Sequence, residues 1–148
     1  MANQIQLRGG FRKEEAVASG TVTPGMLLEM TSATADTVKA HASPGGYAER
    51  IVAVEDALQG GIVTDDYATT AHVTYHVMDA GAVANMLIAA GENIAKGDEL
   101  ISEGTGMLLE NGSEGSGVTV YQVIGIAMEA CDLSASGAVD TLCAVRLL

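Results

Sequence analysis

Two histidines four residues apart form the pattern in this sequence that most resembles a metal site. His72 and His76 have an H-x-x-x-H spacing, which on a helix would place both rings on one face. The residues between them, Val73-Thr74-Tyr75, favour a strand, where this spacing separates the two side chains by roughly 13 Å. One Zn²⁺ ion cannot take both ligands at that separation, and no motif marks a third ligand. We therefore predict no metal site here and expect both histidines on one face of a sheet.

Paired carboxylates are the other arrangement that can do chemistry. They occur at Glu55-Asp56, Asp65-Asp66 and Asp98-Glu99. Neighbours on a strand point to opposite faces, so such pairs seldom cooperate as acid and base, and in loops they are usually solvated. The sequence contains no phosphate-binding glycine loop, no G-x-S-x-G nucleophile elbow and no calcium-loop spacing. We therefore predict that the chain is not an enzyme and needs no cofactor.

The elements that would position these residues are short strands. Apolar, β-branched segments alternate with Gly, Pro and Asp turns every eight to twelve residues, a pattern typical of a β-sandwich or β-barrel. We expect an all-β fold, a small sandwich or barrel with at most one or two short helices. The segment 82–90 fits strand or helix by period, and the flanking glycines favour a strand. The expected strands include 25–30, 50–54, 72–78, 82–90, a hairpin of 99–101 with 107–109, 118–126 as the longest, and 141–148.

The first twenty residues differ from the rest. They contain three of the seven basic residues and the only Phe, with a Gly9-Gly10 hinge. Two interpretations stay open at this point. One is an N-terminal arm, residues 1–20, which becomes ordered on a partner. The other is a first edge strand of the domain's own sheet.

A self-similarity runs through the remaining domain, residues 21–148. Val22–Met30 matches Ile94–Ser102 in its apolar, Gly and Leu positions, 72 residues apart. At the same offset, Ile51–Val54 stands against Val123–Ile126. Two matches at one spacing favour a repeated β motif, with units of about 21–58 and 93–130.

Charge excludes several classes of partner. The chain has 19 acidic and 7 basic residues and a net charge of −12. Nucleic acid and anionic membranes need clustered Lys and Arg, so we expect neither as a partner. No apolar run approaches the length of a membrane span and no secretory signal opens the sequence. The two cysteines, Cys131 and Cys143, are therefore expected to be reduced strand residues of a protein made in a cytoplasm.

The order of these segments resembles the capsid decoration proteins of tailed bacteriophages, also called cement or head-stabilising proteins. Those chains are likewise rich in Gly, Ala, Val and Thr, poor in aromatic residues, and built of repeated Gly-Leu turns and V-G-I-A strands. The resemblance covers residues from about 20 to 148, and this chain is longer than the smallest members. The segments that carry it are Asn3–Leu7, Val22–Glu29, Arg50–Val54, Ile94–Leu100 and Gln122–Ala127.

The resemblance implies a small β domain of the β-tulip kind on the outer surface of an icosahedral head. Such proteins bind the major capsid protein and usually form homotrimers at three-fold and quasi-three-fold positions. Their N-terminal arm often adds a strand to a capsid sheet edge. Here that segment would pair through its main chain, its three bases would meet capsid acids, and Phe11 would be an anchor. The implied capsid-binding residues are Asn3, Gln4, Ile5, Gln6, Leu7, Arg8, Phe11, Arg12 and Lys13.

Two other classes stay open. One is the small β domain of a carbohydrate-related enzyme, which would need polar residues converging in a cleft and His41, His72 or His76 near a carboxylate. The other is a cytoplasmic β carrier or adaptor domain, which would need a modified lysine or a peptide groove. Lys96 precedes a turn glycine but lacks the methionine flanks of a carrier lysine, so we interpret it as a turn residue.

Overall fold

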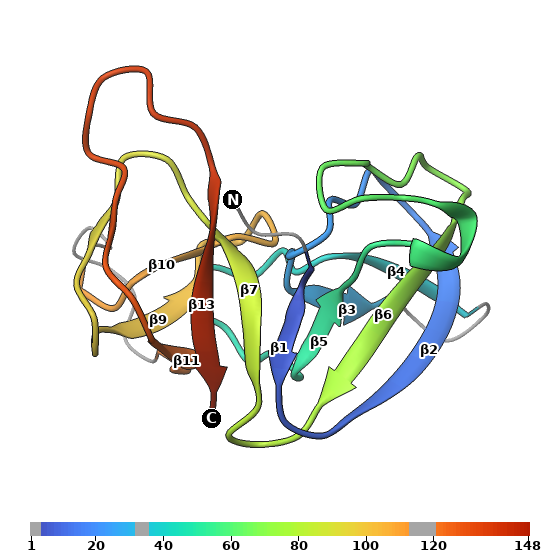
Figure 1. The fold of residues 1–148 in the computed structure, drawn as a ribbon, viewed down its shortest axis with the longest axis horizontal. Helices are drawn as coiled ribbons and strands as arrows, with labels where there is room; N and C mark the ends of the chain where they lie inside the picture. Colours follow the sequence, from blue (N-terminus) through green and yellow to red (C-terminus); the bar gives the residue numbers. More distant parts are fainter. Residues whose placement is uncertain (1–3, 32–35, 113–120) are drawn as a thin grey trace.

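A computed structural model describes residues 4–31, 36–112 and 121–148, and it places nearly all regular structure in β-strands (Figure 1). Two groups of strands lie side by side, with β1 between them. The one helical element of the described residues is the single 3₁₀ turn η1 (Ala57–Gln59). The all-β prediction with at most one or two short helices is therefore confirmed.

The first group, here called the N-terminal barrel, has the neighbour order β3-β4-β2-β6-β5. An antiparallel bridge between Leu27 and Val52 joins its two ends, so the sheet closes on itself. Its strands are β2 (Phe11–Ala18), β3 (Leu28–Met30), β4 (Thr37–Ala40), β5 (Ile51–Ala53) and β6 (His72–Met78).

The second group, the C-terminal barrel, has the order β7-β10-β9-β11-β13 and closes through the pairing of β7 with β13. Its strands are β7 (Val83–Ile88), β9 (Glu99–Ser102), β10 (Leu108–Glu110), β11 (Gly125–Ala127) and β13 (Thr141–Leu147). The short strands β8 (Asn93–Ile94) and β12 (Cys131–Asp132) pair with each other outside the barrel. The predicted small β-barrel is thus present twice in one chain.

The two barrels share one strand order and several hydrogen bonds at the 72-residue offset. Val17 N donates to Asp36 O at 2.8 Å, and 72 residues later Ala89 N donates to Leu108 O at 2.9 Å. Parallel pairing follows in both places, β2 with β4 and β7 with β10. The similarity therefore extends over whole barrels and beyond the two short segments visible in the sequence. A common origin by duplication stays a hypothesis.

The match of Ile51–Val54 with Val123–Ile126 in the sequence differs by two residues from the correspondence in the structure. Gly25 N donates to Ala53 O, and its counterpart Gly97 N donates to Ala127 O, each at 2.9 Å. Ala53 therefore corresponds to Ala127, an offset of 74, since the loops before β5 and β11 differ in length.

The core consists of two clusters of small and branched aliphatic residues, as the scarcity of aromatic residues requires. The smaller cluster fills the N-terminal barrel around Val73 and Tyr75. The larger one joins residues of the C-terminal barrel, such as Met86 and Leu100, to Leu27 and Val52 of the N-terminal barrel. The two barrels therefore pack together through a shared apolar core.

The N-terminal segment belongs to the domain's own sheets. The strand β1 (Gln6–Arg8) pairs antiparallel with β7, and β2 pairs with β6 from Phe11 to Val17. Of the two interpretations of this segment, the structure favours a strand of the domain's own sheets: β1 lies at a sheet edge, whereas β2 lies between β4 and β6. Residue 3 lies outside the described residues.

Several predicted strands are confirmed and one is wrong in extent. His72–Met78 is a strand with the predicted bounds, Val83–Ile88 lies inside the predicted 82–90, and β9 pairs with β10 as the predicted hairpin. The predicted longest strand at 118–126 is wrong in its described part, because residues 121–124 are not strand and β11 begins at Gly125. In these residues the side-chain amide of Gln122 accepts a hydrogen bond from Ala48 N and donates one to Ala48 O. These two bonds hold residues 121–124 in an irregular conformation.

Candidate binding surface around the N-terminal segment

The residues predicted to bind a capsid form a connection across both barrels. After β1 the chain turns at Gly9 and enters β2, so one short segment runs from the edge of β7 to the edge of β6 (Figure 1). Asn85 fixes its start, because the Asn85 amide nitrogen donates to Gln4 O at 2.8 Å and the Asn85 main-chain N–H donates to Ile5 O at 2.7 Å. The start of the segment is thus tied to the C-terminal barrel.

The predicted residues differ in their exposure. Ile5 is fully buried in the core shared by the barrels, so its side chain does not belong to a binding surface. Leu7 and Phe11 are 42% and 44% exposed, which is high for large apolar side chains in a folded domain. The others of the described set are exposed or half-buried: Gln4, Gln6, Arg8, Arg12 and Lys13.

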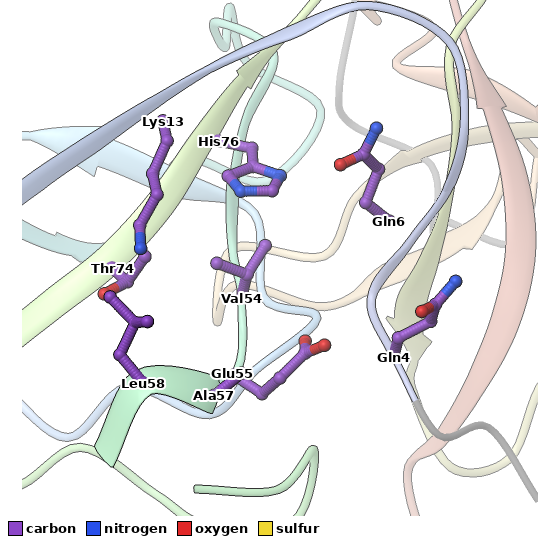
Figure 2. Close-up of a pocket in the computed structure, with 9 residues that line it drawn as sticks. All are labelled: Gln4, Gln6, Lys13, Val54, Glu55, Ala57, Leu58, Thr74 and His76. Atoms are coloured by element: carbon purple, nitrogen blue, oxygen red, sulfur yellow. The ribbon is translucent and has the colours of Figure 1, made fainter. Parts of the chain in front are cut away.

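A cavity of about 190 Å³ lies between this segment and the outer face of the N-terminal barrel. Figure 2 shows Gln4 and Gln6 on one side of it, Lys13 and Thr74 on the other, and His76 above Val54. The full set of lining residues is Gln4, Gln6, Lys13, Val54, Glu55, Ala57, Leu58, Thr74 and His76. The cavity therefore combines one acid, one ammonium group, two amides and one imidazole.

His76 is the unusual member of this cavity. It is only 9% exposed, its ring stacks on Phe11 with a centroid distance of 3.9 Å, and its Nδ1 has no hydrogen-bond partner among the described residues. Burial lowers the pKa of His76, and the positive charge of Lys13 lowers it further. The ring is therefore neutral at pH 7 and offers one unused polar nitrogen to a bound group.

Glu55 ties the N-terminal segment to the cavity. Its Oε2 accepts a hydrogen bond from the main-chain N–H of Ile5 at 3.1 Å. This bond joins residues fifty positions apart and holds the segment over the outer face of β5 and β6. Glu55 and His76 thus share one cavity, which places a histidine and a carboxylate at one site.

The charged residues at the start of β2 interact with one another. Arg12 Nε lies 2.6 Å from Glu14 Oε1, and the two side chains are 73% and 38% exposed. The hydrogen bond from Arg12 lowers the pKa of Glu14, and a second from the Tyr75 hydroxyl adds to this. Burial, together with the bond to Glu14, raises the pKa of Tyr75 to about 12. An ion pair this exposed contributes little to stability, so Arg12 remains free to exchange partners.

A serine, histidine and glutamate also meet between the barrels, and the sequence alone gave no sign of it. His41 Nδ1 lies 2.7 Å from Ser102 Oγ, and His41 Nε2 lies 2.9 Å from Tyr47 O and 3.9 Å from Glu29 Oε2. A carbonyl only accepts, so Nε2 carries the proton and Nδ1 accepts from the Ser102 hydroxyl when the ring is neutral. His41 and Ser102 are 1% and 0% exposed, so no substrate reaches the hydroxyl. The trio therefore joins the barrels and is not a hydrolytic site.

The other sequence candidates, His72 and the two cysteines, do not line the cavity at His76. His72 is exposed on β6, and the described residues hold no cluster of three or more side chains suited to a metal ion. The two cysteines are free and buried in β12 and β13. Among the described residues, no helix is long and apolar enough to cross a membrane. A wider groove of about 900 Å³ crosses the outer face of β7 and β13, with Leu7 and Leu142 among its apolar lining.

The comparisons with known proteins concern the fold. No protein-family model matches the sequence, and no curated protein matches it. The structure is similar to the N base of the head fiber gp8.5 of bacteriophage phi29, with a TM-score of 0.60. The match covers 94% of this chain and 95% of that chain at 14% sequence identity. The pair of barrels is therefore a fold that a phage head fiber base also has.

Proposed function

We propose that this chain is a structural protein of a phage virion. It binds the outer surface of an icosahedral head, contacts the major capsid protein and stabilises the capsid lattice, as a homotrimer. The observation that carries the proposal is the match of the whole fold to the base of a phage head fiber. The likeness of the sequence to capsid decoration proteins supports it independently.

The proposed contact surface is the exposed part of the N-terminal segment. Arg8, Arg12 and Lys13 are exposed in a chain whose net charge is −12, and Lys13 lies on the same face of β2 as Phe11, whereas Arg12 faces the other way. Phe11 is 44% exposed, and its stacking on His76 holds its ring in place. A fixed, partly exposed aromatic side chain with an exposed base on the same strand face is a suitable anchor for a partner surface that carries carboxylates.

The physical mechanism is preferential binding. A protein that binds the mature lattice and not its disassembled subunits lowers the free energy of the lattice. Each contact need not be strong, because many copies bind one shell and copies joined to each other gain effective concentration. No covalent step is required.

A second candidate function rests on the cavity. His76 with its unpartnered Nδ1 and Glu55 line one polar space, as a carbohydrate-related domain would need. The cavity has the amides, acid and cation that hydrogen-bond sugar hydroxyls. Titration with neutral monosaccharides, followed by the ¹H–¹⁵N spectrum, tests it. Shifts confined to the cavity residues support this function, and an unchanged spectrum at high millimolar sugar rejects it.

The test of the main proposal uses heads of the encoding phage that lack this protein. Wild-type protein is mixed with these heads and sedimented, and we expect saturable co-sedimentation. The variant Arg12→Glu/Lys13→Glu should bind at least about tenfold more weakly, because it reverses two contact charges. Lys39→Glu/Arg146→Glu is the matched control, since it changes the net charge equally on other strands.

Deleting the first thirteen residues is not a clean test. That deletion removes β1 and the buried Ile5, so it would disturb the fold along with the contact surface. The charge-reversal variants leave the strands intact. Equal binding by both double variants contradicts the assigned surface, and absence of wild-type binding contradicts capsid association itself.

A further inference from the structure

The two free cysteines lie together in the core of the C-terminal barrel. Cys131 and Cys143 are 8% and 4% exposed, and both belong to the larger apolar cluster. Burial raises the pKa of the Cys143 thiol, and a hydrogen bond with the Cys131 thiol raises it further. The two thiols are therefore neighbours inside the barrel, although they are twelve positions apart in the sequence.

The strand arrangement explains why these two positions meet. Met128 N, just after β11, donates to Ala144 O on β13 at 2.8 Å, so the approach to β12 runs along β13. Cys131 is the first residue of β12 and is buried in the core. Cys143 faces the same core from β13, because the buried residues of that strand alternate with more exposed ones. The pair therefore joins two different strands across one core.

The cysteines also stand at the base of a protruding loop. Residues 133–140 connect β12 to β13, and this connection is the red loop that extends beyond the barrel at the top of Figure 1. From residue 134 to residue 141 every side chain but Ala138 is exposed, and Val139 is 72% exposed. A covalent bond between the two cysteines would close this loop where it leaves the barrel.

We propose that Cys131 and Cys143 form a disulfide when the protein meets a small-molecule disulfide oxidant, of which oxidised glutathione is the probe. The bond staples β12 to β13 and closes the loop 133–140 at its base. A chain that folds with reduced thiols in a reducing compartment acquires this link on transfer to an oxidising one. The inference does not depend on capsid binding.

The reaction consists of two thiol–disulfide exchanges. The Cys131 thiolate attacks one sulfur of the oxidant and forms a mixed disulfide, and the released thiolate takes up the proton that Cys131 lost. The Cys143 thiolate then attacks Cys131 Sγ and expels the second thiolate, which is protonated in turn. The two cysteine sulfurs thus lose two electrons, and the oxidant leaves as two molecules of reduced thiol.

Access of the oxidant depends on a local opening, because both thiols are buried. Among the described strands, β12 pairs with β8 alone, through a ladder of two residues, whereas β13 is paired on both sides with β7 and β11. The shorter ladder should open more often, so Cys131 is the cysteine that reacts first. Oxidation is therefore slow in the native protein and leads to one product.

The test is oxidation of purified wild-type protein with excess oxidised glutathione, at a urea concentration below the unfolding midpoint, where local opening is frequent. We expect the intact mass to fall by about 2 Da, the mass of two hydrogen atoms, without a lasting glutathione adduct. A protease that cleaves at aspartate separates the cysteines at Asp132 and Asp140, so the peptide map shows directly whether they are joined.

The stability of the oxidised protein is the second measurement. A disulfide restricts the unfolded chain, so the urea midpoint should rise and should return to the reduced value with dithiothreitol. Cys131→Ala and Cys143→Ala are the controls, because each lacks one partner thiol, and neither should lose mass or gain stability in the same treatment. The wild-type mass and peptide map stand alone if an alanine variant misfolds.

Thiols that stay free after prolonged oxidation overturn the proposal. So do lasting glutathione adducts on both cysteines, a disulfide between two chains, and a joined pair that leaves the urea midpoint unchanged or lowers it.

Discussion

Replacing Ile5 by alanine tests whether the N-terminal segment is part of the folded core. Ile5 is fully buried, and its main chain is fixed by Asn85 and Glu55 on opposite barrels. The substitution removes three carbon atoms, which at about 0.8 kcal/mol each gives about 2.4 kcal/mol of lost transfer energy. The residual cavity adds to this, so we expect a loss of about 3–4 kcal/mol in the free energy of unfolding.

Urea unfolding followed by far-ultraviolet circular dichroism measures this, since the chain has no tryptophan to report by fluorescence. The midpoint should fall while the slope stays unchanged. Leu7→Ala is the matched control, because Leu7 lies two residues from Ile5 in the same segment but is 42% exposed, and it should cost less than about 1 kcal/mol. An Ile5→Ala protein as stable as the control would show that the segment is a free arm in solution.

The same structure makes four further predictions. Gly25→Ala should cost about 2–3 kcal/mol in urea unfolding, since it combines a positive φ with a steric clash, and a wild-type midpoint would contradict the close barrel contact. His41→Leu should cost about 2–3 kcal/mol, because it leaves the buried Ser102 hydroxyl without its acceptor; a neutral effect would refute the bonding role. Burial lowers the pKa of His76 below 6.5, so the unfolded chain binds the proton more readily and stability should fall as pH drops below about 6.5. His76→Gln should flatten that part of the curve, and an unchanged slope would argue against a buried neutral ring. Burial also raises the pKa of Cys143, so a thiol reagent should react with it slowly in native protein and quickly in urea; fast native reaction would contradict its burial.

Much of the strand content was predictable because it depends on local sequence. His72–Met78 alternates β-branched and aromatic residues, and the Gly104–Gly106 turn sets the register of the hairpin around it. The local pattern wrongly predicted a strand at residues 121–124. These residues have high strand propensity but are not part of a β-strand in the structure. There a side chain, Gln122, satisfies the main chain of a distant residue, and strand propensity does not encode that contact.

The division into two barrels was not predictable from local pattern. The N-terminal barrel closes through one bridge, Leu27 with Val52, and nothing in either segment specifies the other as its partner. The 72-residue similarity was the available signal, and it located the Gly25 and Gly97 turns correctly. It could not show that one turn is covered and the other exposed, because that depends on which barrel lies beside it.

The candidate surface was predicted from composition, and only the fold shows which of its residues are exposed. The concentration of bases near the start of the chain marked Arg8, Arg12 and Lys13. It could not distinguish the buried Ile5 from the exposed Leu7, since both fit an alternating strand. The cavity was missed because Gln4, Glu55 and His76 come from three separate segments, which only the tertiary structure joins.

The thermal stability of heads with and without the protein tests the central claim most directly. Calorimetry of expanded heads that lack this chain should show a melting temperature that rises with added protein and saturates when all sites are filled. The Arg12→Glu/Lys13→Glu variant should need about tenfold more protein for the same rise. Wild-type protein that sediments with the heads but leaves their melting temperature unchanged would contradict the account of this chain as a capsid-stabilising protein.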